Sequence, residues 1–302
     1  MKASWIAALL LLPVACAPSI APSAAPERRS YGAPDPSSTL SPAPVRRPPL
    51  AGPLPAPRPS ATPQPRIAPT ASFPDPDRTV WPRMMDRFQT KVEIPETEQA
   101  GTVIGFHLDP RRVTFRVRYT PGEAKFISEW AGDLIRRGER PLLVFPAGFF
   151  TSDNFALGLL VADGDRYGDS IGVGGVFAVQ DGQPEIRWLD PQPVAPAERF
   201  DQAVEAWPAY VSRGAITPLN EHESRAARTV IVETRSGDFF WLISPTDLFR
   251  TVDLARWLID SDLDVYNALN LDGGRSAGYW AGDDDFMDSH VALPAVIAVY
   301  AR

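Results

Sequence analysis

The hydrophobic positions of this chain follow two patterns. Apolar and polar residues alternate with a period of two in residues 102–109 and 113–120, which is typical of half-buried strands, here joined by a short Pro-Arg-Arg connection. Longer apolar runs bounded by turn signals predict more strands, roughly eight to ten in total. One of these runs is interrupted by Ser236-Gly237-Asp238, which predicts a hairpin. The longer runs are residues 141–150, 156–164, 174–182, 207–216, 228–244 and 292–301.

Two segments carry helical spacing instead. Residues 123–138 place apolar side chains on one face and end at Gly138, and residues 246–262 do the same behind Thr246 as the N-cap. Because strands often follow one another directly and only two helices are expected, the predicted fold class is α+β, with a mixed, largely antiparallel sheet and two main helices. The predicted apolar faces consist of Phe126, Ile127, Trp130, Leu134 and Ile135 in the first helix and Leu248, Val252, Ala255, Trp257 and Ile259 in the second.

Proline usage separates a tether from a domain. Of 33 prolines, 18 fall in residues 17–76, a stretch rich in alanine and serine that cannot bury enough apolar surface to fold. Such a composition favours extended polyproline II conformations, so residues 17–76 are predicted to be a disordered tether. Residues 77–302 remain as one domain of a size that folds around a single core.

Residues 1–16 have the layout of an export signal. A lysine precedes an apolar run over residues 5–12, which is too short to span a bilayer as a helix. Cys16, the only cysteine, follows small residues and resembles the modified cysteine of a bacterial lipoprotein, although Pro13 stands where such signals usually have leucine. We expect an exported protein of the bacterial cell envelope, lipid-anchored to a membrane through Cys16, in the periplasm or at the outer membrane. Cleavage by ordinary signal peptidase is the alternative.

The charge balance and the histidines limit which partners and metal sites can be expected. The residues after position 76 carry 23 basic and 34 acidic side chains, and no basic face is concentrated among them. A nucleic-acid-binding domain normally displays such a face, so nucleic acid is not an expected partner. The three histidines, His107, His222 and His290, are too scattered along the chain to predict a zinc site.

The run NLDGGRSAGYW, from Asn270 to Trp280, is the strongest candidate for chemistry. It follows an apolar stretch that suits a buried strand, and Asp272-Gly273 by itself is a common signal for a two-residue hairpin turn. A hairpin gains nothing from an arginine and a serine after the glycines, whereas glycines let backbone N–H groups approach an anionic ligand. An aspartate at a strand end is suited to act as a general acid or base, or to bind a hard metal ion. We interpret the run as the floor of a site that also serves as a turn.

Two further segments are candidates for ligand contacts. Gly148 and Phe149 follow a predicted strand, and an aromatic ring there stacks well on a sugar, although a core position is the alternative. Arg228 and Thr229 open another strand. Arginine in that place is suited to bidentate recognition of a phosphate or carboxylate, and a surface ion pair agrees with the pattern equally well.

The order and spacing of several segments resemble the phosphodiester glycosidase family over roughly residues 95–302. The resemblance implies an enzyme that hydrolyses the glycosidic bond between a sugar and a phosphodiester, with a carbohydrate or sugar-phosphate polymer as its partner. The segments that carry it are PAGFF…GLLVADG, AVEAWPAYVSRG, RAARTVIVE…GDFFWLIS, ALNLDGGRSAGYW and the closing LPAVIAVYA.

The chain departs from the family pattern at two positions. Pro146 stands where the family has asparagine, at the start of an Asn-Gly-Gly-Phe-Phe motif, and Glu205 stands where it has glutamine. Proline offers neither side-chain polarity nor an N–H. Because a site built to hydrogen-bond its ligand loses much when one partner is lost, a non-catalytic glycan- or polymer-binding envelope module is the alternative function.

The resemblance and the local chemistry together imply roles for the remaining motif residues. Arg228 and the backbone N–H groups of Gly273 and Gly274 are expected to hold the phosphate, and Asp272 to act as acid or base or to bind a divalent cation. Ser276 is expected to position a substrate oxygen. The other expected substrate contacts are Gly148, Phe149, Thr229 and Trp280, with the rings of Phe149 and Trp280 bounding the sugar.

Overall fold

The computed structural model describes residues 84–94 and 98–302. The predicted export signal with Cys16, the tether and the predicted start of the domain at residue 77 lie outside the described residues. Within the described part of the chain, no helix is long and apolar enough to cross a membrane.

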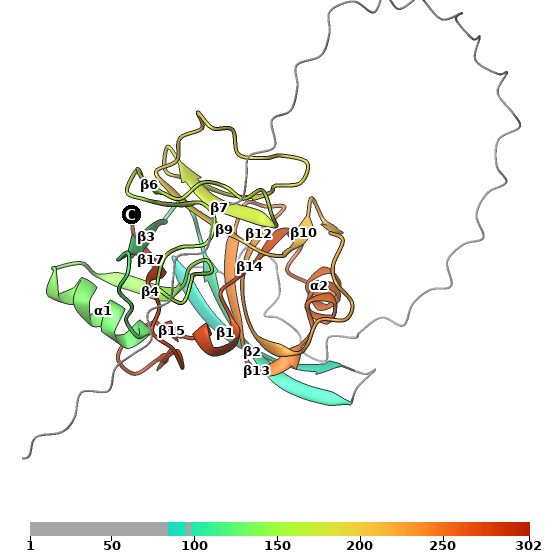
Figure 1. Ribbon diagram of the computed structural model, residues 1–302. Coiled ribbons are helices and arrows are strands. Elements are labelled where there is room, and N and C mark those ends of the chain that lie inside the picture. The colour runs from blue at the N-terminus through green and yellow to red at the C-terminus, as the bar shows by residue number, and fades with distance from the viewer. Residues whose placement is uncertain (1–83, 95–97) are drawn as a thin grey trace, which may run out of the picture. The chain divides into compact units, whose positions relative to one another are not determined.

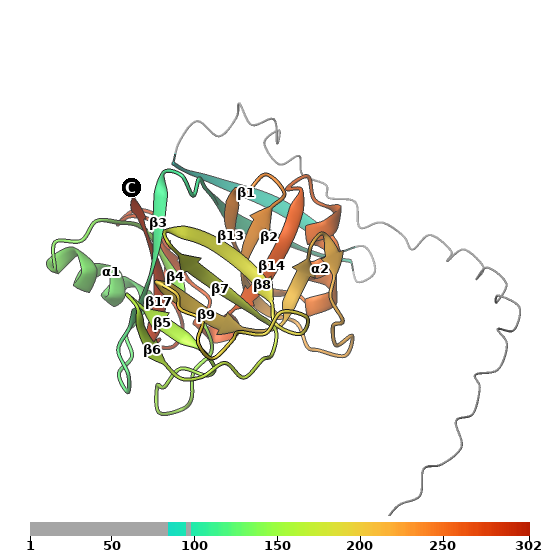
Figure 2. The same cartoon turned by 90° about the horizontal axis from the view of Figure 1, so that it is seen from above.

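Three sheets make up the described part of the chain (Figures 1 and 2). The first sheet has the strand order β1-β2-β13-β12-β14-β10-β11, the second β16-β15-β4-β17-β3 and the third β6-β5-β9-β7-β8. The strand pairings within the sheets are antiparallel. The predicted α+β class with largely antiparallel sheets and two helices is therefore confirmed.

The strands vary widely in length. The first sheet comprises β1 (Met85–Ile94), β2 (Gln99–Leu108), β13 (Phe239–Phe249), β12 (Ala226–Thr234), β14 (Val265–Leu271), β10 (Ala209–Ser212) and β11 (Ala215–Ile216). The second comprises β16 (Phe286–Met287), β15 (Tyr279–Trp280), β4 (Pro141–Pro146), β17 (Ala295–Ala301) and β3 (Val113–Tyr119). The third comprises β6 (Asp165–Tyr167), β5 (Leu160–Ala162), β9 (Gln202–Ala206), β7 (Gly175–Gln180) and β8 (Gln183–Trp188). The described residues form seventeen strands where eight to ten were expected, and five of them have only two or three residues, too few to show a period.

One central core lies between the inner faces of all three sheets. Trp241 from the first sheet, Phe145 from the second and Phe177 from the third are each fully buried in it. Each such side chain contributes about 1.5–3 kcal/mol by leaving water. The outer face of each sheet has a smaller cluster of its own, so every sheet is buried on two sides.

The two helices cover outer faces on opposite sides of the molecule (Figures 1 and 2). Helix α1 (Ile127–Arg136) packs Trp130 and Leu134 against β4 and β17 of the second sheet. Helix α2 (Thr251–Asp260) packs Trp257 and its neighbours against the first sheet. Their burial on one face explains the helical period of the sequence.

Both helices differ from the prediction in where they begin and in which residues form the buried face. In α1, Phe126 is the N-cap and 39% exposed, and Ile135 is 46% exposed, so neither belongs to the buried face. In α2, Ile259 is 36% exposed. The predicted N-cap Thr246 is wrong, because β13 continues to Phe249, where it pairs with Ala226, and the helix begins only at Thr251.

Candidate functional site

Asp272 directly follows β14 and is buried, with 8% of the residue exposed. The chain does not form a two-residue hairpin at this point but enters a short 3-10 helix, Gly274–Ser276. Gly273 is required by close packing, since a Cβ there would lie 2.8 Å from the carbonyl oxygen of Ala227 at the start of β12. The DGG segment is thus pressed against the neighbouring strand.

Burial controls the acidity of Asp272. Desolvation raises the pKa of its carboxyl from 3.8 to about 7, and hydrogen bonds from the Ser276 hydroxyl and the Gly273 N–H lower it only in part. A carboxyl that changes protonation near neutral pH is suited to general acid or base catalysis. Two groups expected to contact substrate, the Ser276 hydroxyl and the Gly273 N–H, therefore contact Asp272 itself.

Arg228 in β12 lies near the end of β14 that leads into Asp272. Thr229 of β12 pairs with Leu271, the last residue of β14, so Arg228 and Asp272 each lie one residue beyond the last pair of this ladder. Successive side chains of a strand point to opposite faces, so Thr229 lies on the other face. Thr229 is fully buried there, and its hydroxyl has no hydrogen-bond partner among the described residues.

Arg228 is a buried cation, with only 8% of its side chain exposed, and its ion-pair partner Glu223 has 38% of its side chain exposed. Its Nη2 donates to the backbone oxygen of Ser224 at 3.0 Å and its Nε to that of Phe249 at 3.3 Å. Its Nη1 lies 3.4 Å from a carboxylate oxygen of Glu223. These protein acceptors fix the plane of the guanidinium group near the start of β12.

A polar network beside Arg228 was not predicted from the sequence. The Tyr210 hydroxyl donates to Oδ1 of Asn270 at 2.8 Å, and the Asn270 amide donates to the backbone oxygen of Trp207 at 2.8 Å. Tyr210 is fully buried, which raises the pKa of its phenol, and the charge of Arg228 opposes that shift. The segments WPAY and NLDGG contain these residues, but nothing in their spacing along the sequence shows that they meet.

The bend after β4 joins the same site. The backbone N–H of Asp272 donates to the oxygen of Ala147 at 3.0 Å. A Cβ on Gly148 would lie 2.7 Å from the backbone oxygen of Glu205, so Gly148 is required by the close approach of β9. The ring of Phe149 packs on Trp207 with 4.5 Å between centroids. Pro146, the departure from the family motif, is buried at the end of β4.

Gly274 and Trp280 are the remaining predicted site residues. Gly274 has a φ of +57°, and a Cβ there would meet no atom within 4 Å, so this residue borders open space. Trp280 in β15 packs with the α1 cluster, whereas Phe149 packs against the central core and Trp207. The structure therefore pairs Phe149 with Trp207 and not with Trp280. Among the described residues, no group of three or more His, Cys, Asp or Glu side chains is arranged to hold a metal ion.

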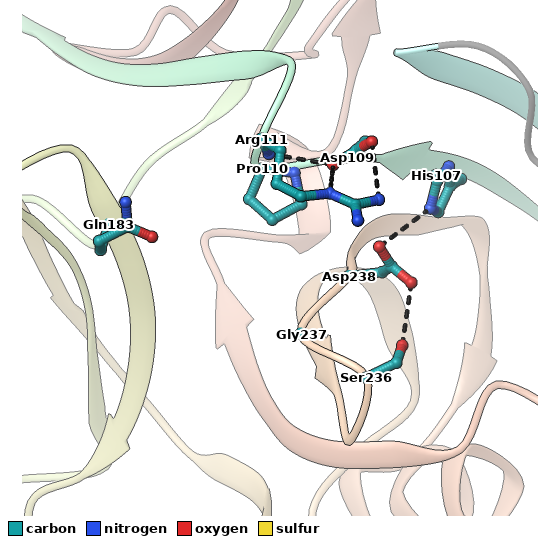
Figure 3. A pocket seen from close by; sticks show the side chains of 8 residues that line it. All are labelled: His107, Asp109, Pro110, Arg111, Gln183, Ser236, Gly237 and Asp238. Carbon is teal, nitrogen blue, oxygen red and sulfur yellow. Dashed lines mark hydrogen bonds and ion pairs between the residues drawn. The ribbon is translucent and has the colours of Figure 1, made fainter. Parts of the chain in front are cut away.

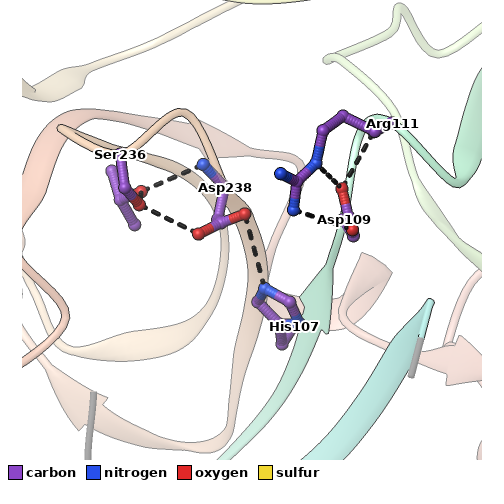
Figure 4. Close-up of polar contacts among 6 residues, drawn as sticks. His107, Asp109, Arg111, Ser236 and Asp238 are labelled. Carbon is purple, nitrogen blue, oxygen red and sulfur yellow. Dashed lines mark hydrogen bonds and ion pairs between the residues drawn. The ribbon is translucent and has the colours of Figure 1, made fainter. Parts of the chain in front are cut away.

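A separate cavity of about 500 Å³ lies at the opposite end of the first sheet (Figure 3). The strand β12 runs between the two places, and at ~3.3 Å per residue Arg228 and Ser236 are roughly 25 Å apart. Asp238 accepts a hydrogen bond from Ser236 at 2.9 Å and lies 3.8 Å from His107, while Asp109 pairs with Arg111 at 2.9 Å (Figure 4). The cavity is lined by His107, Asp109, Pro110, Arg111, Gln183, Ser236, Gly237 and Asp238.

Comparisons with known proteins agree with the resemblance found in the sequence. A family model described as phosphodiester glycosidase matches residues 142–300. The catalytic domain of zebrafish N-acetylglucosamine-1-phosphodiester alpha-N-acetylglucosaminidase, solved in a form auto-inhibited by its pro-peptide, is similar in fold. Its TM-score is 0.58 at 18% identity, over 73% of this chain and 84% of that one.

A hypothetical protein from Synechocystis also shares the fold, with a TM-score of 0.54 at 17% identity, over 72% of this chain and 62% of that one. No curated protein matches the sequence. At these identities the two solved structures establish the fold alone, whereas the family model spans more than half of the chain.

Proposed function

Because this chain belongs to the phosphodiester glycosidase family, we propose that it hydrolyses the bond between a sugar and the phosphodiester attached to its anomeric carbon. The observation that carries this proposal is the Asp272 carboxyl, which is buried at the end of β14 with a pKa of about 7. Such a group holds or releases a proton at neutral pH, as a general acid or base must.

In the proposed reaction, the ionised Asp272 accepts a proton from a water molecule as that water attacks the anomeric carbon. The bond between this carbon and the phosphate oxygen breaks, and its electron pair leaves on the phosphate, which departs as a phosphate monoester. Since this leaving group is already a stable anion, stabilisation of charge matters more than protonation by a strong acid. The products are the free sugar and the phosphate monoester of the aglycone.

Arg228 supplies the positive charge for the phosphate in this proposal. Arg228 precedes Thr229, which pairs with the last residue of the strand leading into Asp272, and its backbone acceptors and Tyr210 hold it in place before substrate arrives. A cation that is already oriented loses little freedom when a phosphate binds. Gly274, which borders open space, is the backbone position of the DGG segment left to face the ligand.

The alternative is a non-catalytic glycan- or polymer-binding module. It is favoured by Pro146, which brings no polar side chain to the end of β4. The substitution Pro146→Asn tests this alternative directly. If the wild type binds glycan without turnover and Pro146→Asn hydrolyses it, the protein lost its reaction at this position.

The test of the enzyme proposal is release of free sugar from a panel of sugar-1-phosphodiesters, beginning with those of N-acetylglucosamine, with and without divalent cations. We expect release by the wild type and none by Asp272→Asn. Glycan binding without release from any compound would contradict the enzyme proposal and support the module. Dependence of release on added cations would identify the cofactor.

We also propose that the protein works in the cell envelope, held to a membrane by a lipid on Cys16. The proposal is supported by the layout of residues 1–16 and by the proline-rich stretch that follows. Growth with a labelled fatty acid should label the wild type and not Cys16→Ser. Equal labelling of both would contradict lipid attachment at this residue.

A further inference from the structure

A groove runs along β8, between the third sheet and the first. Two cavities, of about 220 Å³ and about 200 Å³, adjoin there, and we call the two together the β8 groove. Its far wall includes Tyr266 at the start of β14. At ~3.3 Å per residue along that strand, Tyr266 lies roughly 20 Å from Asp272, so the groove is separate from the candidate site. The residues that line both cavities are Trp188, Gln192, Ser212 and Arg213.

Strand β8 is the last strand of the third sheet, yet its outer edge is unsuited to pairing with another strand. The backbone N–H of Ile186 points away from β7 and donates to Oε2 of Glu233 at 3.3 Å. Pro184, two residues earlier, faces the same edge and has no backbone N–H. A peptide that adds to a sheet needs such N–H groups as donors. The β8 groove is therefore not built for an extended polypeptide.

The charged side chains that line the β8 groove balance one another, with the acidic Glu185 and Glu233 beside the basic Arg187 and Arg213. Arg187 lies 2.7 Å from a carboxylate oxygen of Glu198 and 3.3 Å from one of Glu185. Burial raises the pKa of Glu233, which favours its uncharged form. A site for nucleic acid or another polyanion needs an excess of cations. The β8 groove thus suits a neutral ligand.

Aromatic rings and neutral polar side chains make up much of the remaining lining. Trp188 and Tyr266 are both half-buried, so each ring keeps part of its surface exposed. Gln192 and Ser212 line both cavities beside Trp188, and their amide and hydroxyl groups each donate and accept hydrogen bonds. A sugar ring presents C–H groups on its faces, which stack on aromatic rings, and hydroxyls at its rim, which also donate and accept. The lining therefore matches a sugar on both counts.

The polar part of the β8 groove is in place before any ligand binds. The Asn267 amide donates to Oε2 of Glu233 at 2.8 Å, and its Oδ1 accepts from the N–H of Arg213 at 3.0 Å. The same Oε2 accepts from Ile186 of β8. Glu233 and Asn267 therefore tie β8, β14 and the turn after β10 together. A groove whose walls are already fixed loses little freedom on binding.

We propose that the β8 groove binds a neutral oligosaccharide, as a glycan-binding site separate from the residues around Asp272. A sugar ring stacks on Trp188 in this assignment, and its hydroxyls contact Gln192, Ser212 and Glu233. The proposal goes beyond the proposed function, because the β8 groove needs neither Asp272 nor turnover. A glycan polymer held there would stay attached to the protein between reactions at the candidate site.

The test measures, by calorimetry, the affinity of the full-length protein for neutral hexasaccharides of glucose, galactose, mannose and N-acetylglucosamine. We expect the wild type to bind at least one of them. Trp188→Ala should weaken that binding about tenfold, because it removes the stacking ring, and Gln192→Ala about threefold, because it removes one hydrogen-bonding group. The matched control Gln99→Ala, exposed at the start of β2 and outside both cavities, should bind as the wild type does. Asp272→Asn should also keep its affinity.

Trp188 packs partly against the central core, so the thermal unfolding of Trp188→Ala is followed alongside. If that variant does not fold, the exposed Gln192 decides the point. Failure of the wild type to bind any of the four hexasaccharides would overturn the proposal, as would equal weakening in Gln192→Ala and Gln99→Ala. Tighter binding of a galacturonic acid hexasaccharide than of all four would overturn the neutral class of ligand.

The same variants separate this proposal from the proposed function. Loss of binding in Asp272→Asn, with full binding in Trp188→Ala and Gln192→Ala, would place the glycan at the candidate site. That result would overturn the β8 groove and leave the proposed function standing. Hexasaccharide binding that depends on Trp188, in a protein that releases no sugar from any phosphodiester, would support the β8 groove and overturn the proposed function alone.

Discussion

The two ends of the first sheet contain aspartates of similar burial and opposite chemistry. At one end, Asp272 is surrounded by protein, and desolvation raises the pKa of its carboxyl to about 7. At the other, beside the large cavity, hydrogen bonds from Arg111 hold the pKa of Asp109 below its ordinary value. The comparison teaches that a paired aspartate is fixed in its ionised form, whereas an aspartate desolvated without a cation partner is suited to exchange a proton at neutral pH.

The largest expected effect is on turnover. Asp272→Asn should lower the rate of sugar release by roughly 10³-fold, because general acid–base catalysis contributes about 10²–10⁴-fold. Asp109→Asn is the matched variant at the other end and should change the rate little. Steady-state assays of both variants on one phosphodiester decide the point. Loss of turnover in Asp109→Asn, with activity kept in Asp272→Asn, would place the reaction at the cavity.

The second effect is on the pH dependence of stability. Between its unfolded pKa of 3.8 and its folded pKa of about 7, Asp272 keeps its proton only when folded. Its contribution to stability is therefore fully present below about pH 4 and is lost as the pH rises through about 7, for a total of about 4 kcal/mol. The contribution of Asp109 to stability changes with pH in the opposite direction, because its lowered pKa gives stability that is lost on acidification.

Denaturant unfolding at pH 4 and pH 8 measures this difference. The free energy of unfolding of Asp272→Asn, relative to wild type, should rise by about 4 kcal/mol between the two pH values. The free energy of unfolding of Asp109→Asn, relative to wild type, should not increase at pH 8. A constant difference between wild type and Asp272→Asn at both pH values would mean that the folded carboxyl titrates normally.

A smaller effect, on stability, is expected from replacing the glycines at the two ends of the first sheet by alanine. An alanine at Gly273 places a Cβ against the backbone oxygen of Ala227, and we expect a loss of about 2–3 kcal/mol from overpacking. At Gly237, in the hairpin beside the cavity, the Cβ would meet open space and only the φ of +81° is unfavourable, which costs about 1 kcal/mol. Chemical denaturation of both variants gives the comparison. Equal losses would show that Gly273 is not tightly packed.

The smallest effect distinguishes the two arginines. Arg228→Lys loses the planar group that reaches Ser224 and Phe249, so we expect about 1–2 kcal/mol of lost stability. Arg111 is 81% exposed, and Arg111→Lys should leave the unfolding midpoint close to that of the wild type, because solvent screens its ion pair. A larger shift in Arg111→Lys than in Arg228→Lys would reverse the assignment of the buried cation.

The sequence by itself determined the local elements and the motif. Apolar runs identified strands such as β4 and β17, helical spacing identified α1 and the body of α2, and the resemblance to the phosphodiester glycosidase family is confirmed by the match to residues 142–300. These features depend on neighbours along the chain, whose side chains already show the period of a strand or a helix. The run from Asn270 to Trp280 was also singled out locally, because its aspartate, glycines, arginine and serine are neighbours along the chain.

Only the tertiary structure decided how these parts act on one another. Cross-strand register brought Arg228 near the end of β14 and turned Thr229 toward the other face, and strand pairing extended β13 over the predicted N-cap of α2. The pKa of Asp272 and the anchoring of two loops between β4 and β7 by hydrogen bonds to Glu205 arise from burial by segments far apart in the sequence. Desolvation and hydrogen-bond geometry depend on which groups meet in space, and no local pattern records that.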